Sequence, residues 1–436
     1  MGSDKTIGSG AAIPTMAFRL FLLCSFVLLA RPQDILTFLQ PMRPALLFTI
    51  LAIGALVLGG RLKELTAALS APESKRYLLF YSIMILGIPF AYNLGTAFHG
   101  VLTGYVVNVL FFVLLVSQVT SMERLKGLIW VICLSTVTYS VFGGLLQSGG
   151  FAEGRMEVVG SAFDPNDTAY VLVSLFPLSL YFVRFDEGRL KRFVAIAAIF
   201  SSVAVILQTG SRGGILALGI VLLIVLLTKA GGIEKGHKIF LIFILASTWL
   251  FMGDRVDVDR YRTLFDLSSD YNVTGEEGRL NVWQGAIDLA VANPVTGVGV
   301  ECFSFAWGVT RQLSGQSNIK WKSIHNSFLQ VAVEVGLIGF GIFMLINLRS
   351  VLTFFRISRI RLQMQSRESR ELSSMGGLML VGFLGLLASG FFISQGYSIF
   401  STLYFALAAA LLRIKGVHTV ADSCKEMPTE SRTIQA

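Results

Sequence analysis

Charged residues are scarce in this sequence. Only 14% of its 436 residues are Asp, Glu, Lys or Arg, whereas 54% are hydrophobic, and the mean hydropathy is +0.69. A soluble domain carries about 25% charged residues, so the composition excludes an ordinary soluble fold and indicates an integral membrane protein. The net charge of +9 does not indicate a nucleic-acid partner, because the basic residues are not gathered on one surface.

Cysteines and known catalytic motifs are also few. Of the four cysteines, Cys24 and Cys133 lie in apolar runs, Cys302 in a long polar segment and Cys424 near the end, with no CxxC spacing. A disulfide within the polar segment is excluded, because Cys302 is alone there. HExxH, Walker A and GxSxG sequences are absent, as is a carboxylate pair with metal-ligand spacing. We therefore expect no metal and no cofactor.

Long apolar runs make up most of the chain. A bilayer core of about 30 Å requires about 20 apolar residues in a helix, so the sequence predicts an all-α membrane protein with about 12 transmembrane helices. The first apolar run lacks a signal-peptide cleavage site and is interpreted as a retained span. The predicted spans are 16–30, 44–60, 77–92, 101–119, 126–147, 168–184, 192–208, 213–229, 238–252, 325–348, 376–394 and 397–413.

The distribution of Lys and Arg predicts the orientation. Most of the 36 basic residues fall in alternate connections and near both termini, which the positive-inside rule places in the cytoplasm. The predicted organisation is nine helices in 1–252, one large outward loop in 253–324, three helices in 325–414 and a cytoplasmic tail in 415–436. In a Gram-negative cell the loop faces the periplasm.

The outward loop contains a helical pattern. Between 277 and 292, the apolar residues Leu280, Trp283, Ile287 and Val291 recur every three or four positions, which predicts an amphipathic helix that ends at Asn293-Pro294. We therefore expect short amphipathic helices that form a cap on the membrane surface.

Two arginines are candidates for binding an anion. Arg212 lies in a glycine-rich turn (208–214) before a predicted helix, where free N–H groups and the helix dipole favour an anion. Alternatively, Arg212 contacts lipid headgroups beside a structural turn. Arg279 begins the loop helix, where a cation opposes the dipole unless an anion is near. Alternatively, it is a solvated residue beside Glu276 and Glu277.

His325 and Asn326 stand where the loop re-enters the membrane. A histidine titrates near neutral pH and can accept a proton from a hydroxyl, so His325 is a candidate general base. Alternatively, the pair only forms an interface and caps the next helix. Glu334 lies nine residues further along, about 13 Å deeper and on the opposite helix face. A buried carboxylate is a candidate site residue, although an interhelical hydrogen bond or salt bridge is the preferred interpretation.

A polar loop precedes the sixth predicted span. It contains Arg155 and an Asp-Pro-Asn turn, in which Asn166 or Asp167 is expected to cap the following helix. A structural role alone explains this loop.

The motifs together resemble those of the O-antigen ligase and polymerase superfamily of bacterial envelope glycosyltransferases. The resemblance spans roughly residues 155–339. The matching residues are Arg155, Gly160 and Phe163-Asp164-Pro165-Asn166; Gly210-Ser211-Arg212-Gly213-Gly214; Arg279-Leu280-Asn281-Val282-Trp283, followed by Pro294, Gly297, Gly299 and Phe303; and His325-Asn326, followed by Glu334-Val335-Gly336.

The resemblance implies a mechanism and a location. The donor is a glycan on undecaprenyl diphosphate, the diphosphate is held by Arg212 and Arg279, and His325 serves the acceptor. It implies a multi-pass enzyme of the bacterial inner membrane that acts at the periplasmic face, surrounded by membrane lipids. The remaining predicted substrate-binding residues are Arg155, Asn166, Ser211, Gly213, Trp283, Asn326 and Glu334.

We expect a metal-independent O-antigen ligase that transfers the glycan to lipid A core oligosaccharide. The ligases carry an acidic residue near the last outer loop, where this chain has Ser394-Gln395-Gly396-Tyr397. A polysaccharide polymerase acting on lipid-linked repeats and a protein O-oligosaccharyltransferase are therefore alternatives. A lipid or polysaccharide transporter is the alternative of a different class.

Overall fold

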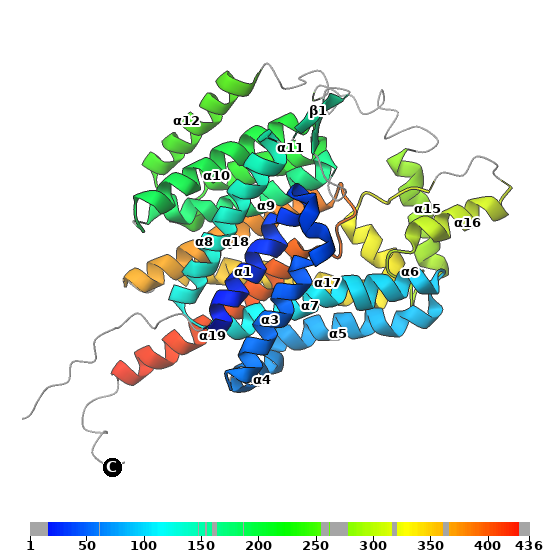
Figure 1. The fold of residues 1–436 in the computed structure, drawn as a ribbon, viewed down its shortest axis with the longest axis horizontal. Helices are drawn as coiled ribbons and strands as arrows, with labels where there is room; N and C mark the ends of the chain where they lie inside the picture. The colour runs from blue at the N-terminus through cyan, green and yellow to red at the C-terminus, as the bar shows by residue number, and fades with distance from the viewer. Residues whose placement is uncertain are drawn as a thin grey trace, which may run out of the picture.

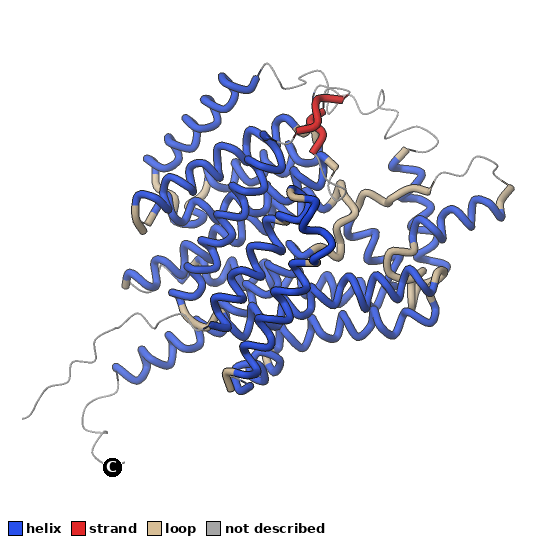
Figure 2. Tube along the Cα trace, viewed as in Figure 1, coloured by secondary structure: helices blue, strands red, loops and turns tan. Residues whose placement is uncertain are grey.

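Helices make up nearly all of the described chain (Figures 1 and 2). The computed structural model describes residues 16–60, 62–146, 148–152, 155–158, 164–185, 187–253, 261, 278–315, 321–360 and 366–426. Within these residues, the predicted all-α fold is confirmed except for one antiparallel hairpin of β1 (Ser148–Ala152) and β2 (Arg155–Val158). The hairpin begins after an apolar run has ended, and the two strands satisfy each other's backbone groups.

The first part of the chain forms a series of helices connected by short turns. They are α1 (Met16–Ala30), α2 (Pro32–Ile35), η1 (Thr37–Met42), α3 (Pro44–Leu58), α4 (Leu62–Ser70), α5 (Pro72–Gly87), η2 (Ile88–Phe90), α6 (Leu94–His99), η3 (Gly100–Tyr105), α7 (Val106–Gln118), α8 (Met122–Thr138) and η4 (Tyr139–Leu146). Segments η3 and η4 are π-helical and continue α6 and α8 without a break. A wider π turn inside a helix is frequently found at functional sites.

The second part of the chain contains the longest helices. They are α9 (Pro165–Arg184), α10 (Arg189–Gln208), α11 (Arg212–Leu227), η5 (Ala230–Gly232), α12 (Lys235–Met252), α15 (Arg279–Ala292), α16 (Phe303–Leu313), α17 (Ser327–Ser358), α18 (Arg367–Gly390) and α19 (Ile399–Glu426). The predicted loop helix is present as α15, which ends where Asn293-Pro294 was expected to stop it, but Leu280, Ile287 and Val291 of the predicted apolar stripe are exposed, and Val282, Ala286 and Leu289 are buried instead. Helix α19 continues past the predicted end at 413, because no proline or glycine pair interrupts it.

Helices α9 and α18 form the centre of the bundle. Every side chain of α9 from Thr168 to Phe182 is buried, and the helix contacts α8, α10, α11 and α18. Gly382 and Gly385 allow α18 to approach α9 closely: a Cβ at Gly382 would lie 2.5 Å from the Ser174 carbonyl oxygen. Small residues at such contacts let two helix backbones pack together within a membrane.

Several helices have the length and composition of membrane spans. Within the described residues they are Leu94–Gln118, Met122–Phe142, Pro165–Arg184, Arg189–Gln208, Ser327–Ser358 and Arg367–Gly390, six in all. A bent pair, Pro44–Leu58 with Lys63–Ser70, makes seven if it is one span. Each of the twelve predicted spans overlaps a described helix, but the number of helices that cross the membrane stays a prediction. The chain is a multi-pass membrane protein.

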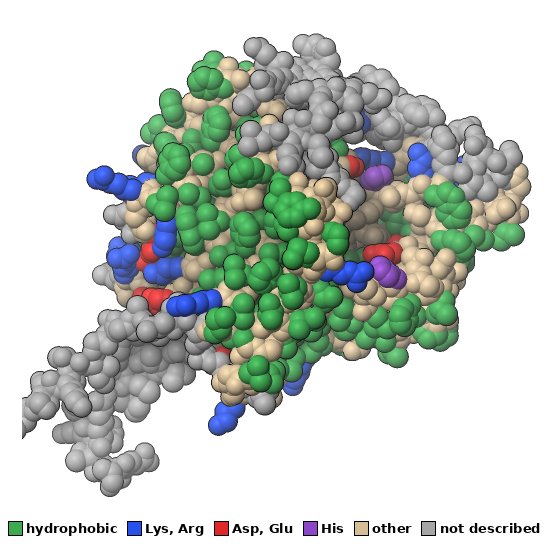
Figure 3. All heavy atoms as spheres, viewed as in Figure 1, with side chains coloured by type: hydrophobic (Ala, Val, Ile, Leu, Met, Phe, Trp, Pro, Cys, Tyr) green, Lys and Arg blue, Asp and Glu red, His purple; other side chains and the backbone are tan. Residues whose placement is uncertain are grey.

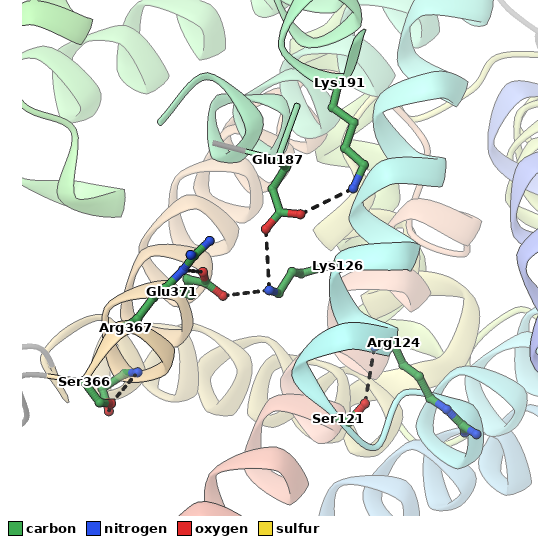
Figure 4. A network of polar contacts seen from close by, with 9 residues as sticks. Ser121, Arg124, Lys126, Glu187, Lys191, Ser366, Arg367 and Glu371 are labelled. Atoms are coloured by element: carbon green, nitrogen blue, oxygen red, sulfur yellow. Dashed lines mark hydrogen bonds and ion pairs between the residues drawn. The ribbon is translucent and has the colours of Figure 1, made fainter. Parts of the chain in front are cut away.

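A network of ion pairs joins one end of the bundle (Figure 4). Glu371 at the start of α18 is only 2% exposed, and its carboxylate pairs with Lys126 at 3.0 Å and Arg367 at 2.8 Å. Glu187 pairs with Lys126 and Lys191 at 3.5 and 3.4 Å. The network therefore ties α8, α10 and α18 together. The opposite end of α9 is about 30 Å away, since α9 has 20 residues that each rise about 1.5 Å.

Candidate active site

The start of α9 supplies polar side chains at the end of the bundle opposite to the ion-pair network. Asp164 caps α9, because its carboxylate accepts the backbone N–H groups of Asn166 and Asp167 at 2.7 and 3.0 Å. The prediction that Asn166 or Asp167 caps this helix is wrong: Pro165 occupies the first helical position, which proline favours, and so places Asp164 at the cap. The side chains of Asn166 and Asp167 contact other elements instead.

The glycine-rich turn holds Arg212 beside α9. Ser211 caps α11: its hydroxyl accepts the N–H of Gly214 at 3.1 Å and donates to Asn166 Oδ1 at 2.8 Å. Gly213 is buried under Phe392, where a Cβ would lie 2.7 Å from the Phe392 Cβ. Glycine thus permits the start of α11 to pack against the segment that follows α18. Arg212, the first residue of α11, is half-buried at this junction.

His325 lies in a strained backbone conformation at the start of α17. Its φ of 52° is in the left-handed region, which a residue other than glycine adopts rarely and which costs about 1–3 kcal/mol. The surrounding contacts maintain it. The His325 N–H donates to Ser394 Oγ at 2.8 Å, and Asn326 caps α17 by accepting the N–H groups of Phe328 and Leu329 at 3.0 and 3.1 Å.

The imidazole of His325 is in an environment that favours its neutral form. Burial lowers the pKa of His325 below its ordinary value, and the positive charges of Arg279 and then Lys322 lower it further, while Asp164 acts in the opposite direction. The charges of Arg279 on α15 and Asp164 on α9 therefore both act on this ring. A neutral imidazole at pH 7 can accept a proton.

Trp283 connects α15 to the chain next to His325. Its indole Nε1 donates to the carbonyl oxygen of Ile324 at 2.8 Å, and its ring packs edge-to-face on Phe391 with centroids 5.8 Å apart. Both contacts hold the start of α15, and hence Arg279, over the beginning of α17. The hydrogen bond explains why tryptophan rather than phenylalanine suits this half-buried position.

Ser394 and Gln395 are contact residues to which the sequence analysis assigned no role. Gln395 donates from Nε2 to Asp167 Oδ1 at 2.9 Å, and its backbone N–H donates to Ser327 Oγ at 2.9 Å. The segment 391–398 therefore links α9 to α17 and also supports His325 through Ser394. The signal in the sequence was the polar stretch Ser394 to Ser398 between two apolar runs, because polar groups at a membrane protein's core usually have a function.

Glu334 holds the outward loop against α17. The side chain is 3% exposed, and its carboxylate accepts the backbone N–H groups of Glu301 at 3.1 Å and Phe303 at 3.2 Å. Phe303 begins α16, so the carboxylate lies at the positive end of that helix dipole. The bond to Phe303 joins α17 to α16, so the predicted interhelical hydrogen bond is confirmed, and the bond to Glu301 reaches the loop before α16. A role for Glu334 in substrate binding stays a prediction.

Gly336 breaks α17 where this loop docks. Its backbone angles of φ 77° and ψ 171° belong to a region that only glycine populates, and a Cβ would lie 2.3 Å from the Val295 carbonyl oxygen. We expect Gly336→Ala to destabilise the protein by about 1–3 kcal/mol from the backbone alone, because the loop must move away. The thermal unfolding midpoint of the detergent-solubilised protein measures this change.

Gly341→Ala is the matched control, because a Cβ at Gly341 has nothing within 4 Å. An equal midpoint for the two variants would contradict this account of the break.

The structure places most predicted site residues at one end of the bundle. The starts of α9, α11, α15 and α17 carry them, and segment 391–398 connects these elements. Figure 3 shows two groups of charged side chains, each with a histidine, on either side of a hollow in this face. Arg155 lies in β2, which contacts α9. Its side chain is outside the described part of the structure, so its role stays a prediction.

Comparison with known proteins finds a family model that matches about a third of the chain. Residues 195–344 match the family model described as O-antigen ligase, and no curated protein matches the chain. The matched region runs from α10 into α17 and includes Arg212, Arg279 and His325. It supports an enzyme of the ligase or polymerase type, whose partners are a lipid-linked glycan and an acceptor. Over these residues the chain is similar to O-antigen ligases.

Proposed function

We propose that this protein transfers a glycan from undecaprenyl diphosphate to lipid A core oligosaccharide at the periplasmic face of the inner membrane. The observation that carries the proposal is the shared environment of His325, on which the charges of Arg279 and Asp164 both act. Twelve spans, cytoplasmic termini and a periplasmic loop are part of the proposal. In this topology the candidate site and the ion-pair network lie on opposite sides of the membrane.

The reaction assigns one task to each group. The acceptor hydroxyl oxygen attacks the anomeric carbon of the donor sugar, and its proton passes to a ring nitrogen of His325. The bond from the anomeric carbon to the phosphate oxygen breaks, and the electron pair leaves with undecaprenyl diphosphate. Arg212 and Arg279 neutralise the diphosphate, because guanidinium groups bind phosphate oxygens in pairs. The arginines supply this charge, and the proposal includes no metal.

The other predicted site residues hold His325, Arg212 and Arg279 in position. Asn166 and Ser211 fix the start of α11 next to α9, and Trp283 fixes the start of α15 next to Ile324. Gly213 permits the close contact with Phe392. We propose that they hold the substrate site open between α11 and α15, with Asn326 maintaining the backbone that presents His325.

A reconstituted transfer assay tests the function. Purified protein is supplied with an undecaprenyl-diphosphate-linked oligosaccharide and, in separate reactions, with lipid A core oligosaccharide, with a second lipid-linked repeat or with an acceptor protein. Transfer to lipid A core supports the ligase. Transfer only to the lipid-linked repeat or to protein identifies the polymerase or the protein O-oligosaccharyltransferase, and no transfer to any acceptor would contradict the enzyme.

The transfer rate is expected to depend on the protonation of His325. The base is active when neutral, so the rate falls as the pH decreases through its pKa. Because that pKa is lowered from its ordinary 6.5, the rate should stay near its maximum from pH 8 to below pH 6.5 and decline only at more acidic pH. Initial rates between pH 4.5 and 8 at saturating substrate measure this profile. A decline that begins above pH 6.5 would be inconsistent with a buried neutral base.

A further inference from the structure

A cavity of about 350 Å³, lined by both polar and apolar residues, lies beside the candidate active site. Its walls are the connection after α1, the π-helical segment η3 with α7, the loop residues Val300 and Glu301, and the chain from Gln395 to Phe400. All of these segments belong to the end of the bundle that carries His325. In Figure 3 the hollow between the two charged groups lies on this face.

The cavity and the active site share a wall. Gln395 lines the cavity, while its side-chain amide donates to Asp167 on α9. The preceding residue, Ser394, accepts the N–H of His325. On the cavity side, Asn108 Nδ2 donates to the carbonyl oxygen of Tyr397 at 2.7 Å. A molecule in the cavity is therefore separated from the backbone of His325 by the segment that contains Ser394 and Gln395.

The lining of the cavity presents polar groups that suit a ligand. Gln33 Oε1 is buried and makes no hydrogen bond within the described residues, a state that costs free energy unless a ligand or water donates to it. The Glu301 carboxyl also faces the cavity, and burial raises its pKa. Arg31 and Glu301 both have left-handed backbone conformations, with φ of 50° and 61°. This strain persists only because surrounding contacts fix both residues at the cavity.

The charges of the lining argue against the diphosphate as the occupant. The charge of Arg31 is already paired with Asp34. The negative charge of Glu301 would repel a diphosphate. A polyprenyl chain also does not fit, because buried amide and carboxyl groups would remain without hydrogen bonds. A neutral, hydroxyl-rich molecule supplies the missing hydrogen bonds, because its hydroxyls donate to Gln33 and Glu301. The apolar C–H faces of its rings pack on residues such as Phe400.

We propose that this cavity is a carbohydrate subsite that holds sugar units next to the linkage made or broken at His325. The proposal rests on the proposed function for its place in the reaction, but sugar binding itself does not require transfer. The volume lies at the lower end of the range for ligand pockets and suits a short stretch of glycan. Both substrates carry sugars, so the donor glycan or the acceptor oligosaccharide is the source.

Gly104→Leu tests the subsite by filling it. Gly104 lines the cavity, and the nearest atom to a Cβ there is the His99 carbonyl oxygen at 3.8 Å, so the backbone tolerates a side chain. We expect the KM for one substrate to rise about tenfold or more while kcat changes little. A rise in the donor KM assigns the cavity to the donor glycan, and a rise in the acceptor KM assigns it to the acceptor.

Gly54→Leu is the matched control. It makes the same substitution at a helical glycine with nothing within 4 Å of a Cβ, on α3 and outside the cavity lining. Gln33→Leu is the second variant: it removes the buried acceptor with little change in volume, and we expect it to raise the same KM. Unchanged KM values for both substrates in Gly104→Leu and Gln33→Leu would overturn the proposal.

A binding experiment separates the subsite from the enzymatic reaction. The probe is the oligosaccharide released from the donor by mild acid and, separately, the one released from lipid A core, both without lipid or diphosphate. We expect saturation-transfer NMR signals from at least one of them with the wild type and Gly54→Leu, and none with Gly104→Leu. If the wild type transfers no glycan but shows this pattern, only the proposed function fails. Equal signals with all three proteins would overturn the subsite.

Discussion

Replacing His325 with asparagine is expected to lower the rate of glycan transfer by a factor of about 10² to 10⁴. Asparagine tolerates the left-handed backbone at this position and can hydrogen-bond, but it cannot accept the acceptor's proton at neutral pH. The backbone bond to Ser394 does not involve the imidazole, so the helix start should remain in place. Single-turnover transfer with a radiolabelled donor measures the loss, and the acid limb of the pH profile should disappear with it.

His237→Asn is the control for this substitution. His237 lies at the start of α12, near the end of the bundle that carries the ion-pair network. The substitution is therefore expected to leave transfer unchanged. Substantial transfer by His325→Asn would contradict the assignment of the base. A transporter would behave differently again: wild-type vesicles would show no transfer, and His325→Asn would change the movement of lipid-linked glycan across the bilayer.

Replacing Arg279 should have two effects that can be measured separately. Arg279→Gln removes a charge that is proposed to bind the diphosphate, and we expect the rate to fall about 10²- to 10³-fold, as when a preorganised donor is removed from a transition-state site. It also removes a positive charge that lowers the pKa of His325. The remaining activity should therefore decline at a higher pH than in the wild type, and its pH profile measures that shift.

Two further variants separate charge from geometry. Arg279→Lys keeps the positive charge, so the pH at which the rate declines should stay as in the wild type. The rate itself should fall, because an ammonium cannot bind two phosphate oxygens as a planar guanidinium does. Arg212→Gln should also lower the rate, because it removes the second guanidinium proposed to bind the diphosphate. An identical pH profile for Arg279→Gln and the wild type would contradict the proximity of Arg279 to the imidazole.

Much of the secondary structure follows from local sequence patterns. Apolar runs of 15–25 residues predicted the helices, and the three- and four-residue spacing of Leu280, Trp283 and Ile287 predicted α15. Arg212 and Arg279 were identified by their positions at the starts of predicted helices, and His325 as a titratable residue where the loop re-enters the membrane. The cap of α9 was assigned wrongly, since three acidic or amide residues surround Pro165 and any of them has the chemistry of a cap.

The sequence by itself determined that this is a helical membrane protein, which of its polar residues interrupt the apolar pattern, and where most helices begin. Tertiary structure alone decided that Arg279 and Asp164 both act on His325, that Ser394 and Gln395 support it, and that Glu334 binds a loop. It also decided that a cavity with polar and apolar lining residues lies beside Gln395. The physical reason is separation along the sequence, because periodicity and capping depend on neighbours within a few residues. These contacts instead join residues 31 to 228 positions apart, and they exist only once the helices have packed.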